Sequence, residues 1–418
     1  MKRNLFFAPR DKRGISARAR SAAGGADPSA ARKPRCARAK RILFITDLTG
    51  LGGGETYLLY FTRALAAAGR FVPVVGAFAE GPLTGALRAA GVEVLVLPDV
   101  TLRRAAGLVP VFSPLKFARF VFRLKRRRVA LVQLEQFNNR TFAAAPLARL
   151  AGAPVVLRSH LWSAPVKRYV RWYVRCFFSV VLPVSRNVKN MLERSGVRPR
   201  RVETIPCGVA VSEFAPSAPA AELRTRLNLA PDTFALGMIA RFQRVKGHHV
   251  FLDAVAELIG AGLDFHAFIV GGVAHGRAED ERCREEILRT IRERRLESRL
   301  TLTGFVPDVR DVLHALDAVV VPSLSESFGM VVIESMASGV PVVATRCGGP
   351  EEIIADGVTG FLVPVNDPAA LAGVIQRLAR DPSLRRGVAA RAADHVRRFF
   401  SIEKNVADLS ALYDSLLK

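Results

Sequence analysis

The sequence predicts an α/β protein with two doubly wound domains in tandem. Its 418 residues, half of them hydrophobic, suffice for two domains with a core each. Short apolar runs alternate with helical segments in two separate series, as parallel sheets flanked by helices require. A stretch of small residues and prolines near 214–219 separates the two series. In such domains ligands bind at the carboxyl ends of the strands, where the sheets face each other.

The first series begins with the apolar run at 41–46, which we predict to be a buried strand. A glycine loop containing Gly53 and Gly54 follows, and then a helical pattern at 56–68. Further strands are predicted at 72–78, 92–97, 130–134, 155–157 and 180–184. Residues 41–214 are therefore predicted to form an N-terminal Rossmann-like domain.

The second series follows a predicted linker at 215–232. Its strands are predicted at 234–240, 266–270, 300–302, 318–322, 340–344 and 360–363. They define a C-terminal Rossmann-like domain at 233–398. Residues 399–418 are predicted to be a closing amphipathic helix, because Val406, Leu409, Leu412 and Leu416 fall on one side.

The formal net charge of +25 is concentrated partly at the amino terminus. Residues 1–41 hold thirteen Lys or Arg against two acids, in a stretch rich in Ala, Ser, Gly and Pro. This composition predicts that residues 1–40 are a disordered basic arm. A targeting segment and an upstream start codon are the alternatives.

The five cysteines are scattered and form no Cys-x-x-Cys pair, which favours a reduced, cytoplasmic chain over a disulfide framework or a zinc site. No apolar stretch approaches the roughly 18 to 20 residues that cross a bilayer. The histidines are dispersed and no Asp-x-Asp stands where it would hold a cation under a diphosphate. We therefore expect no metal, and the P-loop and nucleophile-elbow signatures are absent as well.

Glu326 and Glu334 bracket a turn that runs directly into the apolar stretch 330–333. If a helix begins near Phe328 or Gly329, both carboxylates lie near its amino-terminal end and on one side. Such an end offers free N–H groups and a positive dipole to a phosphate, while carboxylates accept hydrogen bonds from hydroxyls. The pattern predicts a sugar-nucleotide site; a capped surface helix is the alternative.

Arg241 and Lys246 lie in a loop between a predicted strand and a predicted helix. Two cations at the cleft-facing end of a sheet can bind a diphosphate through charge-assisted hydrogen bonds of about 1.5 to 3 kcal/mol each. A solvated basic loop is the alternative for this spacing taken alone.

Glycines follow several predicted strands of the second domain. Gly304 and Val306 belong to the turn after the strand at 300–302. Glycine allows the backbone to approach a ligand closely, so both residues are included in the predicted nucleotide site. The Gly-Gly-Pro-Glu-Glu segment at 348–352 opens a helix after another strand, and there ligand binding and simple helix capping are equally good interpretations.

His160 directly follows the strand at 155–157. A lone histidine is most often a polar residue with a local partner. Its place at the carboxyl end of a strand nevertheless makes His160 a candidate for the reacting centre.

Two predicted helices of the first domain have basic faces. These faces contain Lys116, Arg119, Arg123, Arg126, Arg127, Arg168, Arg171 and Arg175, interleaved with Tyr169, Trp172 and other apolar residues. Such faces suit an anionic membrane surface, where each cation contributes about 1 kcal/mol. An ordinary solvated face is the alternative. No module that reads nucleic acid accompanies the charge, so no specific nucleic-acid partner is expected.

Together these motifs resemble the retaining glycosyltransferases of the GT-B fold, specifically family four, also called group 1. The resemblance covers residues 41 to 418 and is strongest over 236–364. The segment from Glu326 to Glu334 matches the Glu-x7-Glu motif of that family. The resemblance implies two Rossmann-like domains that face a central cleft, with the acceptor bound by the N-terminal domain (41–214) and the nucleotide sugar by the C-terminal domain (233–398).

Three roles in the second domain follow from this resemblance. Glu326 would lie near the donor sugar, and Glu334 would bind the ribose hydroxyls of the nucleotide. The backbone amides of Phe328, Gly329 and Met330 would hold the sugar and the phosphate.

The resemblance also assigns roles around the cleft. Arg241 and Lys246 match the basic pair that grips the diphosphate. Gly53 and Gly54 match a glycine loop near the donor, and His160 matches a histidine beside the reacting sugar. Two departures stand out: Cys-Gly-Val-Ala at 207–210 replaces the frequent Asn-Gly-Val-Asp, and 133–136 lacks the histidines of many relatives, which leaves room for an unusual acceptor.

The activity implied is retaining transfer from a UDP-, GDP- or ADP-sugar to a glycan or lipid-linked acceptor, without metal or cofactor. Synthesis of envelope or capsule polysaccharide, or of glycolipid, at the cytoplasmic membrane face is the expected setting. A sugar-nucleotide epimerase or a phosphorylase on the same fold is the rival enzyme. A non-catalytic basic membrane adaptor predicts loss of Glu326, Glu334, Arg241 or Lys246, and all four are present.

Overall fold

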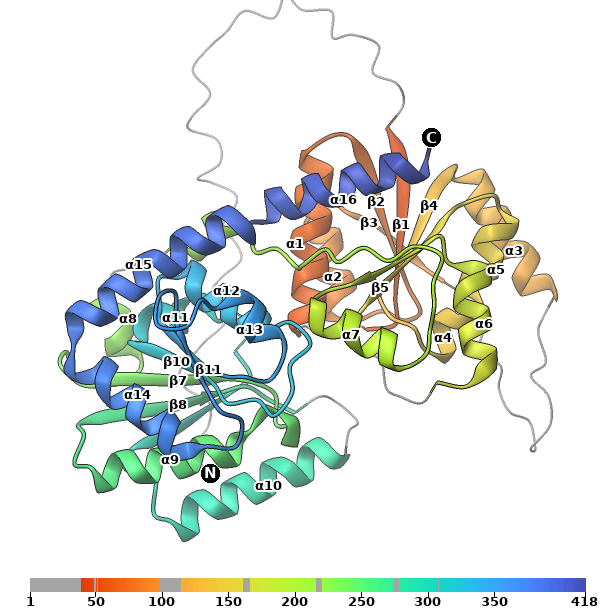
Figure 1. Ribbon diagram of the computed structural model, residues 1–418. Coiled ribbons are helices and arrows are strands. Elements are labelled where there is room, and N and C mark those ends of the chain that lie inside the picture. Colours follow the sequence, from red (N-terminus) through yellow and green to blue (C-terminus); the bar gives the residue numbers. More distant parts are fainter. Residues whose placement is uncertain are drawn as a thin grey trace, which may run out of the picture.

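The computed structural model describes residues 39–48, 50, 52–97, 114–160, 166–215, 220–273, 278–306 and 308–418. Two parallel six-stranded sheets, each flanked by helices, form two domains side by side (Figure 1). This confirms the predicted α/β class with two Rossmann-like domains. The predicted basic arm at 1–40 lies almost wholly outside the described residues.

The first sheet has the order β3-β2-β1-β4-β5-β6, so the strand order reverses between β1 and β4. Its strands are β1 (Lys40–Thr46), β2 (Phe71–Ala77), β3 (Glu93–Val96), β4 (Val129–Leu134), β5 (Val155–Ser159) and β6 (Val180–Pro183). Its helices are α1 (Gly53–Ala67), α2 (Pro82–Ala89), α3 (Pro114–Arg126), α4 (Asn139–Phe142), α5 (Ala144–Leu150), α6 (Arg168–Phe177) and α7 (Arg186–Arg194). The strands form because apolar and β-branched runs are buried on both faces, as a doubly covered parallel sheet requires.

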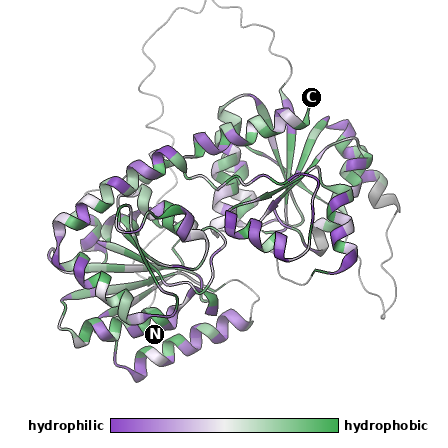
Figure 2. Ribbon diagram, viewed as in Figure 1, coloured by the Kyte–Doolittle hydropathy of each residue, from purple (hydrophilic) through white to green (hydrophobic). Residues whose placement is uncertain are grey.

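The second sheet has the order β12-β11-β10-β7-β8-β9, with its reversal between β7 and β10. Its strands are β7 (Phe234–Ile239), β8 (Phe265–Val270), β9 (Leu300–Gly304), β10 (Ala318–Val321), β11 (Val342–Thr345) and β12 (Phe361–Val363). Its helices are α9 (His248–Gly260), α10 (Ala278–Glu293), α11 (Arg310–Ala315), α12 (Met330–Ala337), α13 (Gly349–Ile353), α14 (Pro368–Arg380) and α15 (Pro382–Phe399). Figure 2 shows hydrophobic strands inside both domains and helices that alternate between hydrophobic and hydrophilic residues.

The chain passes between the domains twice. It leaves the first domain through the 3-10 turn η3 (Val211–Phe214), and the stretch predicted as a linker contains helix α8 (Ala220–Arg226), whose Leu223 is buried. It returns at Ser401 into α16 (Ile402–Leu416), which packs against α1 of the first domain (Figure 1). No helix within the described ranges is long and apolar enough to cross a membrane.

Candidate active site

The reversal points of the two sheets place three loops at the cleft. Strand β1 leads into α1, β7 leads into the loop with Arg241 and Lys246, and β10 leads into the turn with Glu326. The carboxyl ends of strands beside such a reversal leave a crevice for ligands. The sheet topology therefore brings together segments that lie far apart in the sequence.

Helices α1 and α12 meet at Gly53 and Met330. A Cβ atom on Gly53 would lie 3.3 Å from Cβ of Met330, so the two helix starts touch across the domains. A Cβ on Gly54 would meet nothing within 4 Å, which leaves the backbone beside Gly53 open. The predicted glycine loop thus lies directly against the predicted phosphate-binding turn.

Helix α12 begins with unpaired backbone amides. It starts at Met330, and Gly329 caps it with φ 107°, a left-handed conformation that side chains disfavour. Within the described residues, the N–H groups of Phe328, Gly329 and Met330 donate to no backbone or side-chain acceptor. These three amides remain available to an anion at the positive end of the helix.

Lys246 and Glu326 form an ion pair beside these amides. Lys246 Nζ lies 2.7 Å from Glu326 Oε2, which also accepts from Ser323 Oγ at 3.1 Å. Lys246 ends the 3-10 turn η4 (Arg244–Lys246), and Gly247 follows with φ 71°. A Cβ on Gly247 would lie 1.9 Å from the carbonyl oxygen of Pro322, so only glycine lets the two loops approach this closely.

Arg241 is exposed at the carboxyl end of β7. Its side chain has neither a hydrogen bond nor an ion pair within the part of the chain that the structure describes. The neighbouring Arg244 is instead paired with Glu286 at 2.7 Å. Arg241 is thus a free cation on the same rim as Lys246.

Glu334 is buried in the second turn of α12. Burial raises the pKa of its carboxyl group to about 7. No described residue donates a hydrogen bond to this carboxylate. The charge on Glu334 also contributes to the high pKa of Tyr60 in α1, which burial raises to about 12. A buried carboxylate without a donor can accept hydrogen bonds from hydroxyl groups of a ligand.

Gly304 and Val306 lie two strands away from Arg241, at the end of the edge strand β9. Gly304 has φ 74°, and its carbonyl oxygen accepts from the amide of Gly271 at 3.0 Å. Gly271 in turn fits against the loop after β7, since a Cβ there would lie 1.9 Å from the carbonyl oxygen of Ala240. The turns after β7, β8 and β9 therefore form one continuous rim, with Val306 buried beneath it.

His160 is half-buried at the end of β5 and makes no hydrogen bond to another described residue. Burial lowers the pKa of its imidazole to about 3, and the adjacent Arg158 lowers it further. His160 is therefore neutral over the physiological range. Its position places it on the first-domain side of the cleft, without a direct contact to the Lys246–Glu326 pair.

The Gly-Gly-Pro-Glu-Glu segment contains the helix cap that its sequence allowed and a contact to the first domain that its sequence did not indicate. Glu351 caps α13, since its Oε1 accepts from the amide of Gly348 at 3.0 Å. Glu352 instead reaches the first domain, where its carboxylate accepts from the amides of Arg186 and Asn187. Sequence reasoning missed this second role, because nothing in the local pattern separates the two adjacent glutamates.

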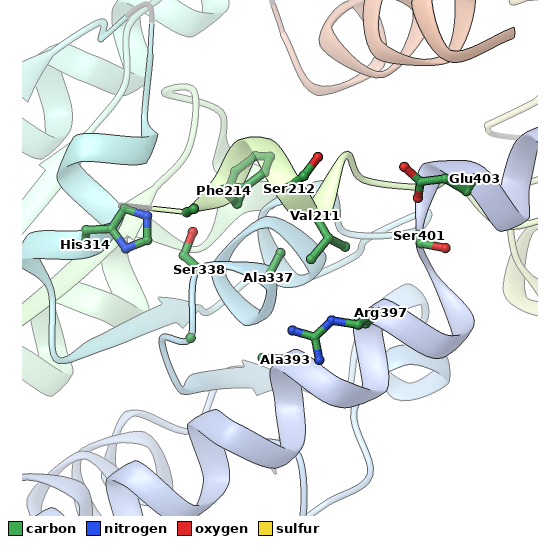
Figure 3. Close-up of a pocket in the computed structure, with 12 residues that line it drawn as sticks. Val211, Ser212, Phe214, His314, Ala337, Ser338, Ala393, Arg397, Ser401 and Glu403 are labelled. Atoms are coloured by element: carbon green, nitrogen blue, oxygen red, sulfur yellow. The ribbon is translucent and has the colours of Figure 1, made fainter. Parts of the chain in front are cut away.

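A separate pocket of about 590 Å³ lies where the chain crosses between the domains (Figure 3). It is lined by η3, His314, the carboxyl end of α12, Arg397 and the start of α16. None of the predicted site residues lines it. The pocket is therefore distinct from the cleft, although α12 connects the two.

Two facing Rossmann-like domains with this cleft define the GT-B class of glycosyltransferases. A sequence profile described as Glycosyltransferase Family 4 matches residues 51–213, and one described as Glycosyl transferases group 1 matches residues 233–381. The chain belongs to this family. The resemblance inferred from the motifs is thereby confirmed.

Solved structures share the fold over most of the chain. Anabaena HepE in complex with UDP-glucose is 25% identical, with a TM-score of 0.76, and the match covers 89% of this chain and 99% of HepE. A glycosyltransferase from Rickettsia africae ESF-5 is 20% identical, with a TM-score of 0.78, and the match covers 91% and 99%.

Curated relatives include D-inositol 3-phosphate glycosyltransferases. That of Corynebacterium urealyticum is 34% identical over 52% of this chain and 51% of the relative. That of Acidothermus cellulolyticus is 35% identical over 50% of this chain and 47% of the relative. The chain thus spans about half the length of the curated relatives it matches.

Proposed function

We propose that this protein transfers a sugar from a nucleoside diphosphate sugar to an acceptor hydroxyl, with retention at the anomeric carbon and without a metal ion. The observation that carries the proposal is the convergence of Lys246, Arg241 and the three free amides of 328–330 at the cleft. Positive groups fixed before the reaction stabilise the charge that develops on a departing diphosphate.

The donor we favour is a UDP-sugar. HepE, which shares the fold, has been solved with UDP-glucose. In this chain Glu334 would accept from the ribose hydroxyls, and Glu326 would contact the sugar next to Lys246. The neutral His160 would lie at the sugar from the first-domain side. The acceptor would attack from the face of the leaving group, whose phosphate takes the acceptor proton.

The test begins with thermal shift measurements against UDP-, GDP- and ADP-sugars, since a ligand that binds the native state raises its melting temperature. NMR of the product then assigns the anomeric configuration, and a parallel reaction contains a chelator. An inverted product contradicts retention, and activity lost to the chelator contradicts metal independence. Release of sugar phosphate with free phosphate would instead identify a phosphorylase.

We further propose that the acceptor domain docks on an anionic membrane surface through one basic and aromatic face. Helices α3, α5 and α6 are neighbours in the structure (Figure 1). Phe122, Leu150, Tyr169 and Trp172 on these helices are all more than half exposed. Residues 100–192 contain eighteen Lys or Arg and a single acid, Glu135, which is buried. Exposed aromatic rings among cations suit a bilayer interface.

Vesicle sedimentation tests this face. Binding to vesicles with anionic lipid should exceed binding to neutral vesicles, and Arg123→Glu with Arg171→Glu should abolish the difference. A matched pair of charge reversals on the exposed face of α10, Arg284→Glu with Arg289→Glu, should leave this difference unchanged. Equal losses from both pairs would show a general charge effect rather than a docking face. A lipid-linked acceptor for envelope polysaccharide or glycolipid would be consistent with such docking.

A further inference from the structure

The amino-terminal end of α7 connects the acceptor domain to the turn that carries Glu326. Ser185, the N-cap of α7, donates from Oγ to the carbonyl oxygen of Ser327 at 2.6 Å. The same Oγ accepts from the amide of Val188 at 3.1 Å, so the side chain is fixed in place by its own helix. A cap residue of the first domain thus holds the backbone next to Glu326.

Asn187 makes a second connection to the same turn. Its Nδ2 donates to the carbonyl oxygen of Glu326 at 3.4 Å, and that oxygen also accepts from the amide of Gly349 at 2.9 Å. The side chain reaches the turn only because Gly348 lacks a Cβ, which would lie 2.1 Å from Asn187 Nδ2. Gly348 also has φ 112°, a conformation that other residues adopt with strain.

Glu352 of the second domain makes a further contact with the start of α7. Its two carboxylate oxygens accept from the amides of Arg186 and Asn187 at 2.8 and 2.7 Å. These are amides that α7 cannot satisfy internally, and a negative charge at this end is favoured by the helix dipole. The carboxylate comes from α13 of the second domain, so the contact exists only while the domains are docked.

These contacts lie directly before the amides of Phe328, Gly329 and Met330. We infer that Ser185 and Asn187 are positioning residues that fix the Glu326–Ser327 backbone, and that Glu352 holds the start of α7 in place for them. The geometry of the phosphate-binding amides therefore depends on docking of the acceptor domain. The role assigned to those amides rests on the proposed function. The mechanical coupling itself requires no ligand and can be measured without one.

Hydrogen exchange of the ligand-free protein tests the coupling. We expect Asn187→Ala and Glu352→Gln each to speed exchange of the hydrogen-bonded amides of Glu326, Val332 and Gly349 by about fivefold to tenfold. Asn187→Ala removes a hydrogen bond to this turn, and Glu352→Gln weakens the two bonds that hold α7 against it. Asn190→Ala is the matched control, because Asn190 is exposed on the same helix. Glu351→Gln controls for charge, since it removes the neighbouring negative charge and can still accept from Gly348. Unchanged exchange in both Asn187→Ala and Glu352→Gln, or equal acceleration in the controls, overturns the inference.

Nucleotide affinity then separates positioning from general stability. Asn187→Ala and Glu352→Gln should bind UDP about tenfold more weakly by calorimetry, at a temperature where their melting curves show them fully folded. Full UDP affinity alongside faster exchange would show that the amides do not serve the donor and would overturn that part of the inference. If the wild-type protein binds no nucleotide, the proposed function fails, whereas the exchange result still decides the coupling.

Discussion

Lys246 Nζ and Glu326 Oε2 face each other at 2.7 Å, although the two residues belong to loops after different strands. Their side chains are only 23% and 15% exposed, so water screens the pair incompletely. A donor diphosphate would compete with Glu326 for the ammonium group. We therefore expect donor binding to redirect Lys246 toward phosphate and leave Glu326 free to contact the sugar.

Replacing Lys246, Glu326 or the unpaired Arg241 should strongly reduce the rate of sugar transfer. We expect Lys246→Ala, Arg241→Ala and Glu326→Gln each to lower kcat/KM by about a hundredfold or more, because each contributes to charge stabilisation or to sugar contact at the site. Initial rates with the best donor measure this effect. Arg244→Ala is the control, since Arg244 lies in the same loop but pairs with Glu286. Wild-type rates in all three site variants would exclude this cleft as the active site.

The pH dependence of stability should report Glu334. Its folded pKa of about 7 exceeds the value of about 4.5 expected when unfolded, so the folded state binds the extra proton. The resulting stabilisation is complete below pH 4.5 and is lost as pH rises through 7. Glu334→Gln should therefore gain about 1 to 3 kcal/mol relative to wild type between pH 5 and pH 8. Urea unfolding at both pH values measures the difference. The exposed carboxylate of Glu285 provides the control variant, Glu285→Gln, and an equal gain there would refute the assignment.

Donor affinity should also depend on the ionisation of Glu334, but it should increase as pH rises, whereas the stability of the fold decreases. Ionised Glu334 accepts hydrogen bonds from hydroxyls better than the protonated acid, so UDP should bind more tightly as pH rises from 6 to 8. Calorimetry of wild type and Glu334→Gln across this range measures the effect. The same rise in the Gln variant would assign the pH dependence to another group.

Gly247 should tolerate no side chain. Gly247→Ala places a Cβ against the Pro322 carbonyl in a left-handed conformation, which should cost about 2 kcal/mol or more and displace Lys246 from Glu326. Gly260→Ala, at the other end of α9, meets nothing within 4 Å and should be neutral or mildly stabilising. Thermal unfolding and UDP affinity compare the two; similar values for both would show that the loop contact is dispensable.

Replacing Arg158 alone should destabilise the protein, whereas replacing Arg158 and Glu135 together should cost much less stability. Arg158 is fully buried, lies 4.3 Å above the centre of the Tyr57 ring and donates from Nη2 to Cys207 Sγ. Burial raises the pKa of Glu135, and Arg158 opposes this rise. Arg158→Met leaves a buried acid without its cation and should cost about 3 to 5 kcal/mol, more at pH 8 than at pH 5. Adding Glu135→Gln should restore much of that loss in urea unfolding, and strict additivity of the two changes would argue against coupling.

The strand pattern, and the loops after the strands that hold Arg241, Lys246 and Glu326, could be predicted from the sequence because both are local. The donor roles of these three residues stay predictions. All twelve predicted strands correspond to strands in the structure, since runs such as 130–134 and 318–322 are buried on both faces. The contact of Gly53 with Met330 was not predicted, since the family resemblance implied only that each of them lies near the donor. Contacts of Glu352 with α7 could not be predicted, because they join residues 165 and 166 positions apart and leave no period in the sequence. The start of α12 at Met330 also differs slightly from the expected Phe328 or Gly329, because Gly329 adopts a left-handed conformation as the cap.

Helix α16 belongs in space to the domain that the chain built first. Tyr413 Oη donates to Gln133 Oε1 at 2.7 Å across 280 positions, and Tyr57 Oη donates to Asn405 Oδ1 at 2.8 Å across 348. During synthesis the amino-terminal domain leaves the ribosome early, but these partners for its buried polar groups are supplied only by the last residues. The first domain to be made is therefore the last to be completed, and a chain that ends just before α16 contains all elements of the second domain but leaves the first without its final helix.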